Sequence, residues 1–183
     1  MEQKPRNFPG EIRRNDLNWN LGTTLVGGNP EDLVTKSSDA EILHSVLERI
    51  LKNYGIALDK DTKFLEIGSG NVVFLDYLIQ RGVNATGVDV SPNWKQASPQ
   101  ALARIEQLPF ADESFNVIFS HGVFDEGVYN QNQDDMMREI SRVLKHGGMY
   151  VGTTLESISA SPMSGLTSVP DLTGNRFKMY RKP

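Results

Sequence analysis

Two glycines and one aspartate are spaced in this chain as a nucleoside-binding site requires. Gly68 and Gly70 directly follow a short apolar run at 64–67, and glycine permits positive φ and close approach of the backbone to a ligand. Asp89 ends a second apolar run about twenty residues further on, where a carboxylate can accept hydrogen bonds from both hydroxyls of a ribose. The pattern predicts a strand, a glycine turn, a helix and a second strand that together hold a nucleotide.

Two kinds of nucleotide compete for this pattern. The dinucleotide fingerprint needs a third small residue three positions beyond the second glycine, so that a pyrophosphate can pass close to the start of the helix. That position holds Val73, which disfavours NAD. An NAD-dependent enzyme therefore stays open as the weaker alternative, and S-adenosylmethionine is the other ligand to consider.

Four short motifs follow one another along residues 63–153. They are Glu66-Ile67-Gly68-Ser69-Gly70, Gly87-Val88-Asp89, Leu108-Pro109-Phe110 with Asp112-Glu113-Ser114-Phe115, and Arg142-Val143-Leu144-Lys145 before Gly147-Gly148. In this order and spacing the chain resembles the class I S-adenosylmethionine-dependent methyltransferase family, in particular its type 11 members. The resemblance implies a methyltransferase that uses S-adenosylmethionine as its cofactor.

The same resemblance implies a cofactor site. Its residues would be Glu66, Gly68, Ser69, Gly70, Asp89, Val90, Ile105, Glu106 and Ser120. The glycines would let the backbone pass the methionine part of the cofactor, Glu66 would hold its ammonium group directly or through water, and Asp89 would bind the ribose hydroxyls. Adenine would lie between Val90 and Ile105, and Ser120 and the residue after it would face the sulfonium.

Four positions depart from the family pattern. Val72 stands where many relatives have a third glycine, and Arg104 stands where an acid often binds the amino group of adenine. Asn116 replaces a usual aspartate, and His146 replaces a usual proline. Without the acid, Glu106 or nearby backbone must accept the hydrogen bond of the amino group. These departures motivate an alternative from another class, a catalytically silent cofactor-binding or scaffold protein with the same fold.

Candidates for acid-base chemistry follow the apolar run at 115–120. An imidazole at His121 titrates near neutrality, and Tyr129 lies in a polar loop expected to border the substrate. A hydrogen-bonded structural histidine and a solvated loop are the competing explanations. The carboxylates at 125, 126, 134 and 135 suit a loop and a helix start, so no metal site is predicted. A sulfonium methyl is already activated, so alignment supplies most of the rate, and a base is needed only for a protonated nucleophile.

The favoured acceptor is a small molecule, and a protein side chain is the less favoured one. The Pro-Pro-aromatic tetrad of enzymes that methylate nucleic-acid amino groups is absent, because residues 120–123 read Ser-His-Gly-Val. The net charge of −4 gives no general attraction to nucleic acid. No apolar run approaches the ~18 residues of a membrane span, and no cysteine is present. We therefore expect a cytoplasmic protein without membrane or nucleic-acid partners.

The elements that must position these residues alternate between strands and helices. Residues 1–36 are rich in Pro and Gly and are expected to form an irregular arm that packs on the domain. Residues 37–183 are expected to form a single methyltransferase-like domain. Helices are expected from Ser38, after Gly70 and from about Asp134, and a loop from Leu155 to Asn175 precedes a last strand from Phe177. The alternation predicts an α/β, doubly wound, mostly parallel Rossmann-like sheet, trimmed after its second and fifth strands.

Overall fold

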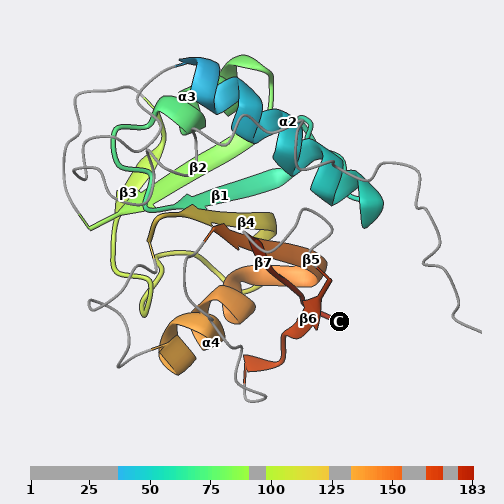
Figure 1. Ribbon diagram of the computed structural model, residues 1–183. Coiled ribbons are helices and arrows are strands. Elements are labelled where there is room, and N and C mark those ends of the chain that lie inside the picture. The colour runs from blue at the N-terminus through green and yellow to red at the C-terminus, as the bar shows by residue number, and fades with distance from the viewer. Residues whose placement is uncertain (1–36, 91–97, 124–132, 154–163, 171–176) are drawn as a thin grey trace, which may run out of the picture.

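The computed structural model describes residues 37–90, 98–123, 133–153, 164–170 and 177–183. The predicted arm at 1–36 and the predicted catalytic Tyr129 lie outside these ranges. Within them, seven strands form one sheet in the order β3-β2-β1-β4-β5-β7-β6. Helices cover both of its faces, as Figure 1 shows, with α2 and α3 on one side and α4 on the other.

The sheet is mixed but mostly parallel. Its strands are β1 (Lys63–Ile67), β2 (Asn84–Asp89), β3 (Gln100–Leu102), β4 (Phe115–His121), β5 (Leu144–Thr153), β6 (Thr167–Val169) and β7 (Phe177–Arg181). The helices are α2 (Ser37–Asn53), α3 (Val73–Gln80) and α4 (Gln133–Val143). The first five strands pair in parallel, whereas β7 is antiparallel to both β5 and β6. The predicted doubly wound α/β sheet is therefore confirmed.

Alternating side chains of the central strands supply two hydrophobic cores. Phe64, Val117 and Val151 face α2 and α3, where they pack with the buried side chains of both helices. The neighbouring Leu65 and Ile118 face α4 and pack with its buried methionines and isoleucine. Because successive residues of a strand point to opposite faces, strands covered on both sides must be apolar at almost every position. This explains the apolar runs in the sequence, which only Glu66 in β1 and Asn116 in β4 interrupt.

Several connections are short, as the sequence predicts. The link from β3 to β4 contains turns and no helix, and no helix occurs in the described part of the link from β2 to β3. The strands β3 and β6 are three residues each. The expectation of loop throughout 155–175 was wrong at β6, because Thr167–Val169 pairs with β7. Serine and threonine gave that segment no apolar pattern, so its pairing depends on the partner strand.

None of the helices in the described ranges has the length and apolar character that crossing a membrane requires.

Candidate functional site

The carboxyl ends of β1, β2 and β4 meet at one edge of the sheet (Figure 1). Ile67 at the end of β1 lies in register with Val88 of β2 on one side and Ser120 of β4 on the other. The glycine turn continues the ladder beyond β1, because the N–H groups of Gly68 and Ser69 both donate to the carbonyl of Val88, at 2.8 and 3.2 Å. Ligands of open parallel sheets bind at this edge, so the predicted site is assembled where the fold allows one.

The carboxylate of Asp89 lies directly beside the glycine turn. Its Oδ2 accepts the backbone N–H of Gly70 at 2.8 Å. The side chain of Asp89, at the end of β2, is therefore bonded directly to the glycine turn that follows β1. A carboxylate has about four acceptor positions, and sugar hydroxyls are donors of the kind that such a group accepts.

Glu66 is the most unusual titratable group of this edge. The residue is 6% exposed, and its Oε2 has no hydrogen-bond partner among the described residues. Burial, followed by the nearby carboxylates of Asp89 and Asp76, raises the pKa of Glu66 to about 8. An uncompensated buried carboxylate is costly, and a cationic group placed against Oε2 would supply both the charge and the hydrogen bond that it lacks. Glu66 therefore fits an ammonium group.

The two glycines of the turn have different surroundings. Both have positive φ, +74° at Gly68 and +46° at Gly70. A Cβ on Gly68 would overlap the side chain of Val123, whereas a Cβ on Gly70 would have only the carbonyl oxygen of Gly68 within 4 Å, at 3.9 Å. The backbone at Gly70 is therefore open to a ligand. At Gly68 the absence of a side chain leaves room for Val123. Sequence reasoning missed Val123, since no local pattern predicts its contact with the turn.

The third conformational peculiarity of the turn is Val72. It has φ 59° and lies directly before α3, in the left-handed region that a β-branched side chain rarely adopts. Its side chain is buried in the core beneath α2 and α3. The departure from the family pattern at Val72 therefore lies where the backbone adopts a positive φ, which glycine adopts more readily than valine.

The expected adenine walls differ in exposure. Val90 is 52% exposed, whereas Ile105 is buried against the α4 side of the sheet. Arg104, the departure from the family acid, forms an ion pair with Glu106 through Nη2 and Oε1 at 3.2 Å. The Arg104 side chain is 69% exposed, so it extends toward solvent from the segment that carries Ile105 and Glu106.

Ser120 and His121 at the end of β4 make contacts that the sequence did not predict. The buried hydroxyl of Ser120 lies 2.8 Å from Tyr150 Oη. His121 Nδ1 lies 2.8 Å from Thr153 Oγ1, which also accepts the N–H of Gly122 at 3.2 Å. Burial lowers the pKa of His121 to about 4, so the imidazole is neutral near pH 7. Its Nε2 is buried without a hydrogen-bond partner in the described part of the chain.

A search of the described residues finds no group of three or more potential metal-ligating His, Asp or Glu side chains. Of the predicted cofactor residues, the glycine turn and Asp89 are in direct contact, while the predicted Tyr129 lies outside the described residues.

Comparison with known proteins agrees with this geometry. Residues 65–152 match the family model described as a methyltransferase domain. The matched segment makes up just under half of the chain and resembles a class I methyltransferase domain. Such domains take S-adenosylmethionine as their methyl donor, and the pairing of an open glycine turn with Glu66 and Asp89 fits that cofactor.

Two curated relatives carry the same kind of domain. The biotin biosynthesis bifunctional protein of Cellvibrio japonicus is 33% identical over 128 residues, which cover 65% of this chain and 25% of that protein. A sterol 4-C-methyltransferase of Caenorhabditis elegans is 29% identical over 110 residues, covering 52% of this chain and 32% of the relative. The chain thus spans about a quarter to a third of the curated relatives it matches.

Among solved structures, a protein from Galdieria sulphuraria described as a sarcosine dimethylglycine methyltransferase has a similar fold. Its TM-score is 0.56 at 18% identity, and the match covers 73% of this chain and 63% of that one. This likeness supports the arrangement of strands and helices in the methyltransferase domain.

Proposed function

We propose that this protein transfers the methyl group of S-adenosylmethionine to a small-molecule nucleophile. The observation that carries the proposal is the buried Glu66, whose Oε2 lacks a partner in the described residues, next to a glycine turn bonded to Asp89. The curated relatives include a biotin biosynthesis protein and a sterol methyltransferase, and these names favour a small acceptor over a protein side chain.

The proposed cofactor contacts follow the chemistry of each group. Glu66 would bind the ammonium group, and the open backbone at Gly70 would run along the methionine part. Asp89 would accept the ribose hydroxyls, and Val90 and Ile105 would enclose the adenine. The bound cofactor would supply a methyl group on a positively charged sulfur.

Catalysis in this proposal depends mainly on alignment. Two groups held in line for transfer gain effective molarities that account for several kcal/mol of the barrier, roughly 7–11 kcal/mol in well-oriented cases. His121 would contribute a hydrogen bond through Nε2 to the acceptor. With a pKa of about 4 it is a weak base, so the proposal favours an acceptor atom that is already unprotonated at neutral pH.

Arg104 supports a second candidate function, a cofactor-binding protein without transfer. Its guanidinium is a donor only, and it stands where family members present a carboxylate to the amino group of adenine. Glu106, which pairs with Arg104 at 3.2 Å, would then have to accept that hydrogen bond.

The two candidates are separated by calorimetric titration of the purified protein with S-adenosylmethionine, S-adenosylhomocysteine and NAD, followed by a transfer assay. We expect saturable binding of both adenosyl compounds and none of NAD. Release of S-adenosylhomocysteine in the presence of a small-molecule acceptor would support transfer. Binding without transfer across a broad acceptor panel would favour the silent protein, and binding of NAD alone would refute both.

A further inference from the structure

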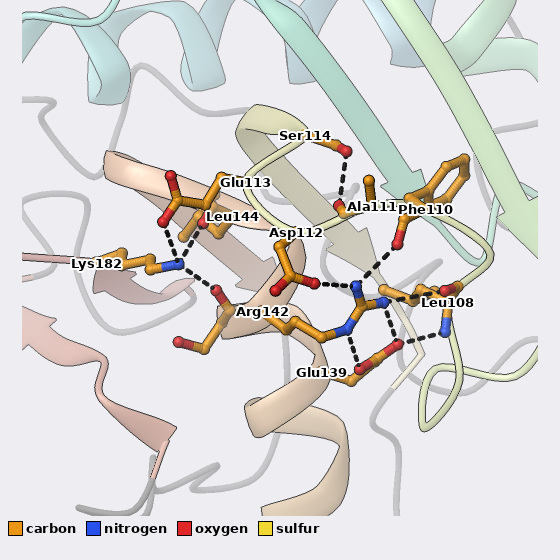
Figure 2. Close-up of polar contacts among 11 residues, drawn as sticks. Leu108, Phe110, Ala111, Asp112, Glu113, Ser114, Glu139, Arg142, Leu144 and Lys182 are labelled. Atoms are coloured by element: carbon orange, nitrogen blue, oxygen red, sulfur yellow. Dashed lines mark hydrogen bonds and ion pairs between the residues drawn. The ribbon is translucent and has the colours of Figure 1, made fainter.

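Two of the sequence motifs, Leu108-Pro109-Phe110 with Asp112 and the Arg142 motif, have no part in the site described so far. The bonded residues lie 30 to 34 positions apart in the sequence, yet a single side chain joins them (Figure 2). Arg142, in the last turn of α4, donates to the carbonyl oxygens of Phe110 at 2.9 Å and Leu108 at 3.1 Å, and to Asp112 Oδ1 at 2.6 Å.

Glu139 completes this arrangement one turn earlier on α4. Its two carboxylate oxygens accept from Arg142 Nε at 2.8 Å and Nη2 at 2.7 Å. Oε1 also accepts the backbone N–H of Leu108 at 2.8 Å. The peptide groups of Leu108 are therefore held through both N–H and C=O by one ion pair. The five contacts of Arg142 match the five N–H donors of a guanidinium in a fixed planar fork.

The segment held in this way needs outside support. Residues 103–114 form turns between β3 and β4, and within this segment the N–H of Gln107 donates to the carbonyl of Arg104 at 3.1 Å. Ile105 and Leu108 anchor the segment by packing with buried residues of α4. The Arg142–Glu139 pair adds directional bonds to this apolar contact, and a fork fixes orientation as well as distance.

The other end of the same segment begins at the cofactor site. Asp89 lies in register with Leu102 of β3, and the carbonyl of Asp89 accepts the N–H of Ala103 at 3.1 Å. Ile105 and Glu106, the residues assigned to the nucleobase, therefore lie between a fixed point at Asp89 and a fixed point at Leu108. A shift of Leu108 would therefore displace Ile105 and Glu106 from the nucleobase.

We infer that Arg142, together with Glu139, is a positioning residue for nucleobase recognition, which it secures by clamping the segment that carries Ile105 and Glu106. This inference rests on the proposed function of the same site. The inference gives the two unassigned motifs one shared role. Helix α4, which covers the opposite face of the sheet from α2 and α3, would set the position of the residues that bind the adenosine part of the cofactor.

The test compares Arg142→Met and Arg142→Lys with Arg138→Met as a matched control. Arg138 lies on the same helix, where it pairs with Asp135 three residues away. Binding of S-adenosylhomocysteine is measured by calorimetry, and binding of adenosine by competition against it. All titrations are made at a temperature at which circular dichroism shows each variant to be folded.

We expect Arg142→Met to raise Kd about tenfold for both ligands, because both contain the nucleobase. Arg142→Lys should not rescue binding, since one ammonium cannot span four partners. Arg138→Met should bind as the wild type does. Glu66→Gln should weaken S-adenosylhomocysteine but not adenosine, which has no ammonium group.

Unchanged affinities in folded Arg142 variants would show a purely structural role and overturn the inference. Weaker binding of S-adenosylhomocysteine with unchanged binding of adenosine would also overturn the inference. If Arg142→Met does not fold, Arg142→Lys alone decides the question by the same two Kd values. Failure of the wild type to bind either ligand would instead refute the proposed function, and the two failures are thereby distinguishable.

Discussion

At the scale of single residues, Glu66 gives the site a distinctive pH response. Its pKa of about 8 in the folded protein, raised by burial and by Asp89 and Asp76, lies above the ordinary value of 4.5. Between these two values the folded state binds more protons than the unfolded state, so the free energy of unfolding falls as pH rises. Ionisation of Glu66 should therefore lower the stability of the cofactor-free protein from about pH 4.5 to about pH 8, and the lowered pKa of His121 opposes this loss below its ordinary value of 6.5.

Glu66→Gln tests this response because glutamine cannot ionise. We expect the variant and the wild type to have similar stability near pH 5, and the variant to gain roughly 1.4 kcal/mol relative to the wild type per pH unit within the window. Urea denaturation at pH 5, 6, 7 and 8 measures the difference. Glu41→Gln on the exposed side of α2 is the control. Parallel pH profiles for wild type and Glu66→Gln would contradict the prediction.

Single-residue chemistry was also the part that sequence predicted best. The glycine turn, Glu66 and Asp89 form a local pattern, and the structure brings them to one edge with Asp89 bonded to Gly70. The partners of Ser120 and His121 were not predictable, because Tyr150 and Thr153 are thirty or more positions away. The same holds for Val123 over Gly68 and for Asp76 near Glu66. Long-range contacts depend on strand order and register, which a local motif does not contain.

At the scale of elements, β2 and the glycine turn depend on close contact at Gly87. A Cβ added to Gly87 would lie 2.6 Å from Ser69 Oγ and 2.9 Å from Leu75 Cδ2. The strand, the turn and α3 therefore meet at a position that admits only a hydrogen atom. This gives the Gly87 of the second motif a packing role in addition to its place before Asp89.

We expect Gly87→Ala to lower the free energy of unfolding by ~1–3 kcal/mol, as overpacking of a filled interior does, and to weaken binding of S-adenosylhomocysteine by displacing Ser69. Chemical denaturation and calorimetry measure the two effects. Thr86→Ala, at the preceding position of the same strand, is the reference variant. Wild-type stability and affinity in Gly87→Ala would mean that the turn adapts without cost.

The elements also mark where sequence patterns fail. Strands β1, β4 and β7 were predicted within a residue or two, and for β1 and β4 the reason is that apolar runs covered on both faces give a strong signal. The helix expected from about Asp134 ends at Val143, and Leu144 already pairs with Phe115 of β4. Segment β6 carries no apolar pattern, and its strand conformation follows from pairing with β7.

At the scale of the whole molecule, all proposed cofactor contacts lie between residues 66 and 120, within the described domain. The boundary at residue 37 stays a prediction. We expect a fragment comprising 37–183 to unfold cooperatively and to bind S-adenosylhomocysteine with an affinity within a few-fold of the full chain, because the two hydrophobic cores that the structure describes are formed by residues of this range.

Thermal melts followed by circular dichroism, together with calorimetric titration, check this expectation against the full chain. A fragment that melts without a transition would show that residues 1–36 contribute to the core. A folded fragment that binds the ligand more than about tenfold more weakly would assign those residues to the cofactor site.

The strand order has a consequence for synthesis on the ribosome. β7 follows β6 along the chain but lies between β5 and β6 in the sheet. While residues 177–181 are still inside the exit tunnel, β6 has no neighbour to pair with and β5 exposes an open edge. The residues of the glycine turn and its nearby carboxylates are synthesised well before β7. Until β7 pairs with β5, the open edge of β5 is exposed to other nascent chains.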